Sequence, residues 1–256
     1  MNQRLELIAL PNFPMVEPGD DLVAMTLESL AALEIELVDG DVLVAAQKIF
    51  SKAENRYAYL NEIEPSSEAL KLAPQIEKDP RITQLILDES VEVVAQRPGA
   101  VIVEHRLGYV HANAGIDQSN ITSDDKNPRV LLLPEDSDRS AAQYRDGIKT
   151  KTGASVCVII NDSAGRAWRN GTLGYTIGSA GFEPVMDMVG EKDLFDRVME
   201  VTEVAVADEL AAAASFLMGQ ASEGAPVVLV RGATLRYADV DSKKLIRQRS
   251  QDLFRD

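Results

Sequence analysis

In the segment SVCVIINDSAGRAWRNG, residues 155–171, an apolar run is followed at once by polar and charged side chains. This change of character indicates a strand that leads into a binding site. Residues 155–160 have the continuous apolar character of a buried β-strand. Residues 161–171 hold one acid, two arginines, two asparagines and the only tryptophan within eleven positions. We expect the strand to end at Asn161 and to deliver these side chains to the carboxyl edge of a sheet, where open α/β sheets bind ligands.

Composition restricts the class of protein. The chain has 256 residues, of which 45% are hydrophobic, enough for one large domain with a sizeable core. Its net charge of −15 argues against a general nucleic-acid or anionic-membrane surface, because long-range repulsion opposes both encounters. An anionic ligand must therefore meet a local basic pocket.

The cysteine content and the N-terminus indicate a cytoplasmic, soluble protein. Cys157 is the only cysteine, so an internal disulfide is excluded, and its apolar neighbours predict a buried, unreactive thiol. The first residues, MNQRLELIALPNF, lack the long apolar core of a signal peptide. No apolar run approaches the roughly 20 residues that span a bilayer.

Strand and helix patterns alternate irregularly along the chain. Short β-like runs fall at 4–9, 41–46, 99–104, 107–111, 129–133, 155–160 and 226–230. Helical patterns fall at 20–34, 81–96, 137–149 and 199–218, with a charged helical tail at 247–256 and an exposed loop at 120–128. This order predicts a single α+β domain over 1–256, built of mixed sheets with packed helices, rather than a doubly wound sheet.

Four segments place polar or small residues directly after an apolar run. They are LPNF (10–13), AAQKIFSKAE (45–54), ANAGIDQSN (112–120) and NDSAGRAWRNG (161–171). Loops of this kind converge at one edge of a sheet, so we expect them to form one pocket. The usual phosphate-binding patterns GxxxxGK[ST] and GxGxxG are absent, so a nucleotide would need another loop design.

Two acids in these segments are candidate metal ligands. Asp117 and Asp162 supply hard oxygen donors from separate loops, which suits Mg²⁺ or Mn²⁺. Lys48 and Lys52 lie four residues apart, and Arg166 and Arg169 follow Asp162, so these cations could neutralise a triphosphate. The alternatives are that the acids cap turns or helices and that the cations are solvated.

Three further residues have a structural interpretation. His105 and His111 lie six apart in strand-like sequence, and we expect structural roles for both. Trp168 could stack on a ring, but a lone tryptophan is more typical of a pocket wall or a core anchor.

Eight segments, taken in order, resemble the coenzyme F420-0:L-glutamate ligase family, also called F420 γ-glutamyl ligases. They are LPNF, DGDVLVAAQKIFSKAENR, KDPRITQLILDESVEVV, RPGAVIVEHRLGYVHANAGIDQSN, LLLPEDSD, NDSAGRAWRNG, EVTEVAVADELAAAASFLMGQASEG and PVVLVRG. The likeness covers about residues 7–232 and leaves 233–256 as a C-terminal tail. Some bacterial relatives carry a nitroreductase-like extension, which we do not expect here.

The resemblance implies an activity and its cofactors. Such a ligase is a homodimer that adds L-glutamate to F420-0, a deazaflavin precursor, through an amide bond formed by way of an acyl phosphate. It uses GTP and two divalent ions, Mg²⁺ or Mn²⁺, with K⁺ as a possible further ion. Its partners are small molecules, with no role for nucleic acid or membrane.

The resemblance also implies site residues. Those expected at the nucleotide are Leu10, Pro11, Asn12, Phe13, Ala46, Gln47, Lys48, Asn120 and the loop Met218, Gly219, Gln220, Ala221, Ser222, Glu223, Gly224, Ala225. The expected metal ligands are Asp117, Asp162, Ser163 and Gln220. The expected catalytic residues are Lys48, Asp117, Asp162 and Arg169, and Lys52 and Arg166 join Arg169 as candidate charges for the acceptor or phosphate.

Three departures from the family pattern keep other functions open. Ala46-Gln47 stands where a hydroxyl-bearing pair is common, Ala164 replaces an aromatic residue, and Gly174 lies where an acid is usual. One alternative is a ligase of the same mechanism that joins an amino acid to a different acid. The other is a catalytically idle nucleotide-binding paralogue.

Overall fold

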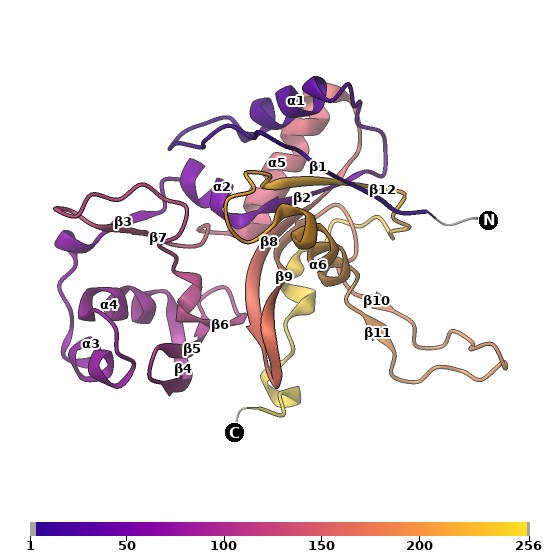
Figure 1. The fold of residues 1–256 in the computed structure, drawn as a ribbon. Coiled ribbons are helices and arrows are strands. Elements are labelled where there is room, and N and C mark those ends of the chain that lie inside the picture. The colour runs from indigo at the N-terminus through magenta and orange to yellow at the C-terminus, as the bar shows by residue number, and fades with distance from the viewer. Residues whose placement is uncertain (1–3, 255–256) are drawn as a thin grey trace.

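Five strands that are far apart in the sequence form one mixed sheet in the computed structural model, which describes residues 4–254 (Figure 1). In spatial order they are β1 (Glu6–Ala9), β12 (Val227–Arg231), β2 (Val42–Ala46), β8 (Cys157–Arg166) and β9 (Arg169–Ala180). Only the β2–β8 pair is parallel; the other three pairs in this sheet are antiparallel. We call this the main sheet.

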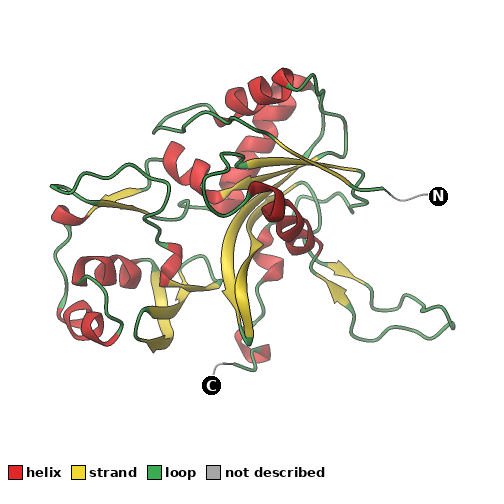
Figure 2. Ribbon diagram, viewed as in Figure 1, coloured by secondary structure: helices red, strands yellow, loops and turns green. Residues whose placement is uncertain are grey.

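Helices cover both faces of the main sheet (Figure 2). The helices are α1 (Leu22–Ala32), α2 (Gln47–Ala53), α5 (Ser137–Thr152) and α6 (Val206–Met218). Alternate strand residues divide between them: Val44 and Ile159 pack with α6, whereas Ala45 and Ile160 pack in the core formed with α1, α2 and α5. Burial of both faces explains why these strands are apolar without alternation. Cys157 is buried as expected.

A second group of elements lies between α2 and α5 in the sequence and forms what we call the small module. Its strands are β3 (Tyr57–Tyr59), β4 (Ser90–Arg97), β5 (Ala100–His105), β6 (Val110–Ala112) and β7 (Arg129–Leu131), and its helices are α3 (Ser67–Leu72) and α4 (Pro80–Asp88). Short 3-10 turns join them at Leu60–Glu62, Ala73–Gln75 and Asn113–Gly115. The strands form a β4-β5-β6 sheet and a separate β3–β7 ladder.

A partly buried ionic cluster around Glu89 joins the small module to the end of α2. Glu89, the C-cap of α4, lies 3.1 Å from Arg56 Nη2, 2.9 Å from Arg106 Nε and 3.4 Å from His105 Nε2. Arg56 also donates to the carbonyl oxygen of Leu133 at 2.8 Å. Burial alone raises the pKa of Glu89, but the neighbouring histidine and arginines lower it to about 2. His105 is fully buried here, in the structural role expected.

Two segments lie outside the layers. The arm, residues 186–204, contains β10 (Met186–Asp187) and β11 (Glu203–Val204) and extends away from the body (Figure 1). The C-terminal segment, residues 241–254, contains 3-10 turns at Ser242–Leu245 and Arg249–Gln251 and lies against β9, the edge strand of the main sheet. Asp138 Oδ1 accepts from the backbone N–H groups of Ser179 and Ser242, each at 2.9 Å, and so holds the segment to the sheet.

The α+β class with mixed sheets is confirmed, as are most of the expected elements. The predicted helix at 81–96 is wrong in its second half. After the expected cap at Asp79 and Pro80, α4 ends at Asp88 and Ser90–Arg97 is strand β4. The β-branched residues Val91, Val93 and Val94 favour a strand, and pairing with β5 decides the outcome.

Four other boundaries also differ from the sequence prediction. The strand at 155–160 does not end at Asn161, because β8 continues to Arg166 and turns into β9 as a hairpin. The strand expected at 107–111 begins only at Val110. The helix at 199–218 begins only at Val206, since the preceding residues form the returning limb of the arm. The tail forms a short 3-10 turn rather than the helix expected over 247–256, of which residues 255 and 256 lie outside the described residues. Within residues 4–254, no helix is both long and apolar enough to cross a membrane.

Candidate active site

The parallel pairing of β2 and β8 brings two candidate residues to the same edge of the main sheet. The last pair of this ladder is Ala46 with Asn161. Helix α2 begins at Gln47, so Lys48 lies in its first turn, while Asp162 directly follows Asn161 on β8. Lys48 and Asp162 therefore lie at the same edge of the main sheet although 114 positions separate them in the sequence.

Two further segments lie at this edge. Leu10 donates its backbone N–H to Val227 at 2.9 Å, and Phe13 donates to Gly224 at 3.3 Å, so the 10–13 loop lies beside the 218–225 loop. Ala46 donates to Pro226 at 2.8 Å, which places the same loop beside the start of α2. The predicted convergence is thus confirmed for the segments that leave β1 and β2. Of the segment 161–171, only its first residues lie at this edge, because the rest continues β8 into the hairpin with β9.

The fourth segment, 117–120, reaches this edge from the small module and not, as expected, from a strand of the same sheet. The backbone of Asp117 pairs with Leu131 on β7 through bonds of 3.0 and 2.9 Å. The Lys48 ammonium lies 2.8 Å from Asp117 Oδ2 and donates to Ser119 Oγ at 2.6 Å. Asn120 Nδ2 donates to the carbonyl oxygen of Ala221 at 3.0 Å. These contacts connect the small module to both α2 and the 218–225 loop.

Asp117 is held as a carboxylate. Burial raises its pKa, but the Lys48 ammonium and the Ser119 N–H outweigh that effect and lower the pKa below its ordinary value. Its side chain retains 35% exposure, so it stays accessible to a ligand.

Asp162 has a histidine as its hydrogen-bond partner. His111 Nε2 donates to Asp162 Oδ2 at 3.0 Å, and Nδ1 donates to the carbonyl oxygen of Ala112 at 2.8 Å. Both partners are acceptors, which favours the doubly protonated, cationic ring. Burial lowers the pKa of His111, but Asp162 outweighs burial and raises it. Sequence analysis assigned His111 only a structural role and missed this contact, for which spacing along the chain gave no signal.

Comparison with known proteins shows the family to which the chain belongs. The sequence profile of the F420-0:Gamma-glutamyl ligase family matches residues 12–232. The chain belongs to this family. It is 43% identical over 253 residues to the coenzyme F420:L-glutamate ligase of Methanothermobacter thermautotrophicus, covering 98% of this chain and 99% of the relative.

Other relatives share the name and the extent of the match. The coenzyme F420:L-glutamate ligase of Methanococcus maripaludis is 43% identical over 252 residues, covering 98% of each chain. That of Methanocaldococcus jannaschii is 41% identical over 253 residues, covering 99% of this chain and 98% of the relative.

Two of the metal ligands expected from the family resemblance, Asp162 and Ser163, lie on opposite faces of β8. Strand alternation directs Asp162 to one face and Asn161 and Ser163 to the other, where α6 packs. Asn161 Nδ2 contacts Met218 Sδ at 3.6 Å, and its buried Oδ1 has no hydrogen-bond partner among residues 4–254. On the α6 side, Gln220 donates through Nε2 to Ser215 Oγ at 3.1 Å, which leaves its carbonyl oxygen as an acceptor.

The first turn of α2 departs from the ligase pattern in a way that the structure explains. Ala46 is the N-cap and makes no side-chain capping bond. Gln47 is 3% exposed, and its side-chain oxygen accepts the Ser51 hydroxyl at 2.8 Å, so this side chain supports the helix internally. A phosphate contact at this turn would therefore come from the backbone and from Lys48.

The remaining candidate charges are not gathered with the acids. Lys52 is 8% exposed, and burial followed by the repulsion of Lys48 lowers its pKa. Arg166 and Arg169 face each other at the tip of the β8–β9 hairpin. Four residues separate Arg166 from Asp162, about 13 Å along a strand at roughly 3.3 Å per residue. The catalytic role expected of Arg169 stays a prediction, and its position lies outside the cluster around Asp117 and Asp162.

Trp168 corrects another expectation. It lies in the turn of the hairpin with φ 59° and is 80% exposed, so it is not a core anchor. Its ring centroid lies 4.6 Å from that of Phe254 in the C-terminal segment. Only two residues connect β8 to β9, and a turn this short places Trp168 in a left-handed backbone conformation. Composition alone did not indicate this turn.

Gly174 replaces the acid usual in the family, and the packing of α6 requires it. A Cβ at this position would lie 2.4 Å from Asn161 Oδ1, 2.4 Å from Ser215 Cβ and 2.6 Å from the carbonyl oxygen of Ala211. One of these neighbours is helix backbone, so side-chain rearrangement cannot relieve the contact. No larger residue fits here without moving α6.

Replacement of Gly174 by alanine is expected to destabilise the protein by about 1–3 kcal/mol through overpacking against α6. The matched control is Gly165→Ala on the neighbouring strand, where a Cβ would meet no atom within 4 Å, so we expect a change within about 0.5 kcal/mol. Urea unfolding of both variants measures the difference. Equal stability of the two variants would contradict the packing described.

Proposed function

We propose that this chain is a GTP-dependent ligase that joins L-glutamate to the deazaflavin precursor F420-0 through an amide bond. The observation that carries the proposal is the convergence of residues 10–13, 46–48, 117–120 and 218–225 beside Asp162. Membership of the family and relatives named coenzyme F420:L-glutamate ligase support the chemistry. The nucleotide would bind among these loops.

The donor set suits divalent ions. Asp117 and Asp162 are hard oxygen ligands, and no three acids, histidines or cysteines converge within residues 4–254, so phosphates and water would complete the coordination. Asp162 Oδ2 accepts a hydrogen bond from His111, and Asp162 Oδ1 has no hydrogen-bond partner in the described part of the chain. We assign Asp117 and Asp162 as the principal ligands of two Mg²⁺ or Mn²⁺ ions. Ser163 and Gln220 are further ligands on the α6 side, and K⁺ remains a possible additional ion.

The bound ions would offset the negative charge of the phosphates during transfer. The chain itself would position the reactants. The Lys48 ammonium is paired with Asp117 in this structure, and it would pair with a phosphate oxygen when the nucleotide binds. The 10–13 and 218–225 loops would enclose the nucleotide, and the Asn120–Ala221 bond would hold the enclosing loops together. Alignment of the reacting groups in this way supplies much of the rate in phosphoryl and acyl transfer.

The proposed chemistry has two steps. The acceptor carboxylate attacks the γ-phosphorus of GTP, which forms an acyl phosphate and releases GDP. The amine of L-glutamate then attacks the acyl carbon, inorganic phosphate leaves, and the amine loses a proton. The product is an amide, and one GTP is consumed for each glutamate added.

A ligase of the same mechanism with a different acid acceptor is the second candidate. The replacement of an aromatic residue by Ala164, close to Asp162 on β8, favours it because the acceptor must approach this strand. Incubation with GTP, Mn²⁺, L-glutamate and F420-0 separates the two. A mass gain of one glutamyl unit supports the first, whereas GTP turnover only with another acid supports the second.

Removal of either acid is expected to abolish glutamylation. We predict that Asp162→Ala and Asp117→Asn each reduce the rate of product formation by at least about 1000-fold, because each removes a charged metal ligand. Mass spectrometry of the F420-0 product measures the rate. Asp125→Ala, an exposed acid in the loop after Asn120, is the control and should keep the wild-type rate. Near-normal glutamylation by Asp162→Ala would contradict the assignment.

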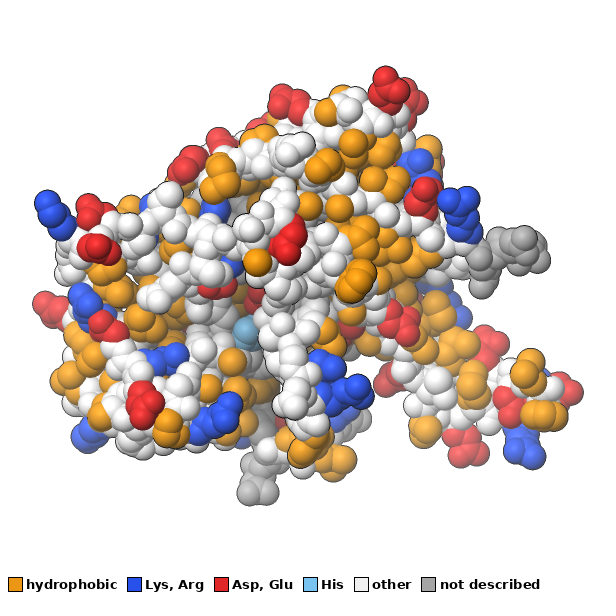
Figure 3. Space-filling model, viewed as in Figure 1, with side chains coloured by type: hydrophobic (Ala, Val, Ile, Leu, Met, Phe, Trp, Pro, Cys, Tyr) orange, Lys and Arg blue, Asp and Glu red, His pale blue; other side chains and the backbone are white. Residues whose placement is uncertain are grey.

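We also propose that the protein is a homodimer and that the arm contacts the second copy. The arm exposes Leu194 by 99%, Val201 by 86% and Phe195 by 79%, and Figure 3 shows hydrophobic side chains along its length. Large apolar side chains exposed together on a projecting segment are typical of an interaction surface.

The double substitution Leu194→Asp, Phe195→Asp is expected to shift the protein from dimer to monomer, because charges would have to be buried at the interface. Analytical ultracentrifugation across a concentration series measures the mass. Glu200→Ala, an exposed polar position on the same arm, should leave the mass unchanged. A wild-type protein that is monomeric at all concentrations would refute the proposal.

A further inference from the structure

A cavity of about 260 Å³ lies between the edge of β9, the start of β6 and the C-terminal segment. Half of its lining comes from the C-terminal segment, beyond residue 232 where the match to the family profile ends. The lining residues from this segment are Ser242, Leu245, Ile246, Arg247, Asp252 and Phe254. The volume is large enough for a small acid or for one arm of a larger molecule.

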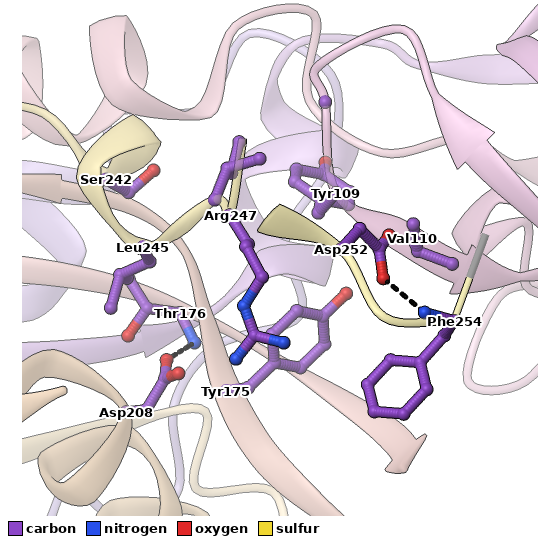
Figure 4. A pocket seen from close by; sticks show the side chains of 12 residues that line it. Tyr109, Val110, Tyr175, Thr176, Asp208, Ser242, Leu245, Arg247, Asp252 and Phe254 are labelled. Atoms are coloured by element: carbon purple, nitrogen blue, oxygen red, sulfur yellow. Dashed lines mark hydrogen bonds between the residues drawn. The ribbon is translucent and has the colours of Figure 1, made fainter. Parts of the chain in front are cut away.

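The cavity holds a cation without an ionic partner. Figure 4 shows the guanidinium of Arg247 beside the ring of Tyr175, with Asp208 on one side and Asp252 and Phe254 on the other. Within residues 4–254, Arg247 makes no ion pair or hydrogen bond. Asp208 is already engaged, since its Oδ1 accepts the backbone N–H of Thr176 at 2.9 Å. An unpaired guanidinium at a cavity mouth is suited to a carboxylate, which it can hold through two parallel hydrogen bonds.

The hydroxyl of Tyr175 is a second unsatisfied group in the same cavity. Its oxygen is buried and has no hydrogen-bond partner in the described residues. A buried hydroxyl without a partner is unfavourable, so it would gain a hydrogen bond from a polar group that reached it from the cavity. Two polar side chains of the wall therefore lack partners within the protein.

The cavity wall is continuous with the candidate active site. Tyr175 is the cross-strand partner of Asp162, and directly opposed residues on antiparallel strands share a face of the sheet. The ring centroid of His111, which binds Asp162, lies 5.7 Å from that of Tyr175. A molecule bound beside Tyr175 would thus lie one side chain away from Asp162, on the face of β8 opposite α6.

We propose that this cavity binds a carboxylate of one of the two substrates to be joined, with Arg247 and Tyr175 as its contacts and the C-terminal segment as its outer wall. The inference rests on the proposed ligase function and assigns a substrate-binding role to the tail. The carboxylate belongs either to L-glutamate or to the acceptor. Anchoring of the C-terminal segment supports the role, since Arg249 lies 2.9 Å from Glu92 Oε1 and ties the segment to the small module.

The test is steady-state kinetics of Arg247→Gln with each substrate varied in turn. We expect the KM for either L-glutamate or F420-0 to rise by about 10–100-fold, the loss typical of a charge-assisted contact, while the KM for GTP stays unchanged. The substrate whose KM rises is the one that supplies the carboxylate. Tyr175→Phe removes one hydroxyl and should raise the same KM by a smaller factor without lowering thermal stability.

Lys243→Gln is the matched control, because Lys243 is an exposed cation of the same segment that does not line the cavity. Unchanged KM values for both carboxylate substrates in Arg247→Gln, with an active wild type, would overturn the cavity assignment alone. An inactive wild type would count against the proposed function. In that case calorimetric titration with L-glutamate and with F420-0 decides the cavity assignment: binding lost in Arg247→Gln supports it, and no effect on binding, or no binding of either compound, overturns it.

Discussion

The parallel register of β2 and β8 is the constraint on which the candidate active site depends. Because Ala46 pairs with Asn161, the first turn of α2 and the second half of β8 leave the same edge of the main sheet. A shift of one residue would reverse the faces of β8 and exchange the positions of Asp162 and Asn161. The apolar side chains on both faces of these strands, packed against helices on both sides, fix this register.

Charge compensation is the second feature of the site. A chain with a net charge of −15 repels a nucleotide triphosphate at long range, so attraction has to arise locally. Each of the two candidate carboxylate ligands has a basic partner, Asp117 in Lys48 and Asp162 in His111. The Lys48 pair lowers the pKa of Asp117, and the two contacts position both carboxylates before ligands arrive. Binding of divalent ions would free the cations for the phosphates.

Asp162 also links two parts of the molecule that the sequence keeps far apart. On one side lie the loops at 10–13, 46–48 and 218–225. On the other lie His111, Tyr175 and the cavity under the C-terminal segment. A ligase must bring a nucleotide and two acids together, and Asp162 lies between the loops and the cavity. Its side chain points to the face of β8 opposite α6, the face that Tyr175 shares.

The sequence predicted much of this arrangement and missed the rest for identifiable reasons. Apolar runs predicted four of the five strands of the main sheet but not β9, whose outer half is exposed and polar. Cap signals such as Asp79-Pro80 predicted where a helix begins. The spacing of apolar residues predicted that the helix would continue through Val91 and Val93, which lie in strand β4. Their conformation is decided by pairing with β5, which the spacing does not indicate. The contact of His111 with Asp162 and the position of Arg247 depend on tertiary packing between segments more than 50 residues apart. Local sequence carries no signal of either.

The assignment of Asp117 and Asp162 as metal ligands is tested most directly by a crystal structure with Mn²⁺ and a non-hydrolysable GTP analogue, in which the anomalous signal locates the manganese ions. We predict manganese peaks at the carboxylates of Asp117 and Asp162, with the phosphates between them and the Lys48 ammonium moved from Asp117 to a phosphate oxygen. The assignment would be contradicted by a nucleotide bound elsewhere. It would also be contradicted by the absence of manganese from both carboxylates while Lys48 remains paired with Asp117.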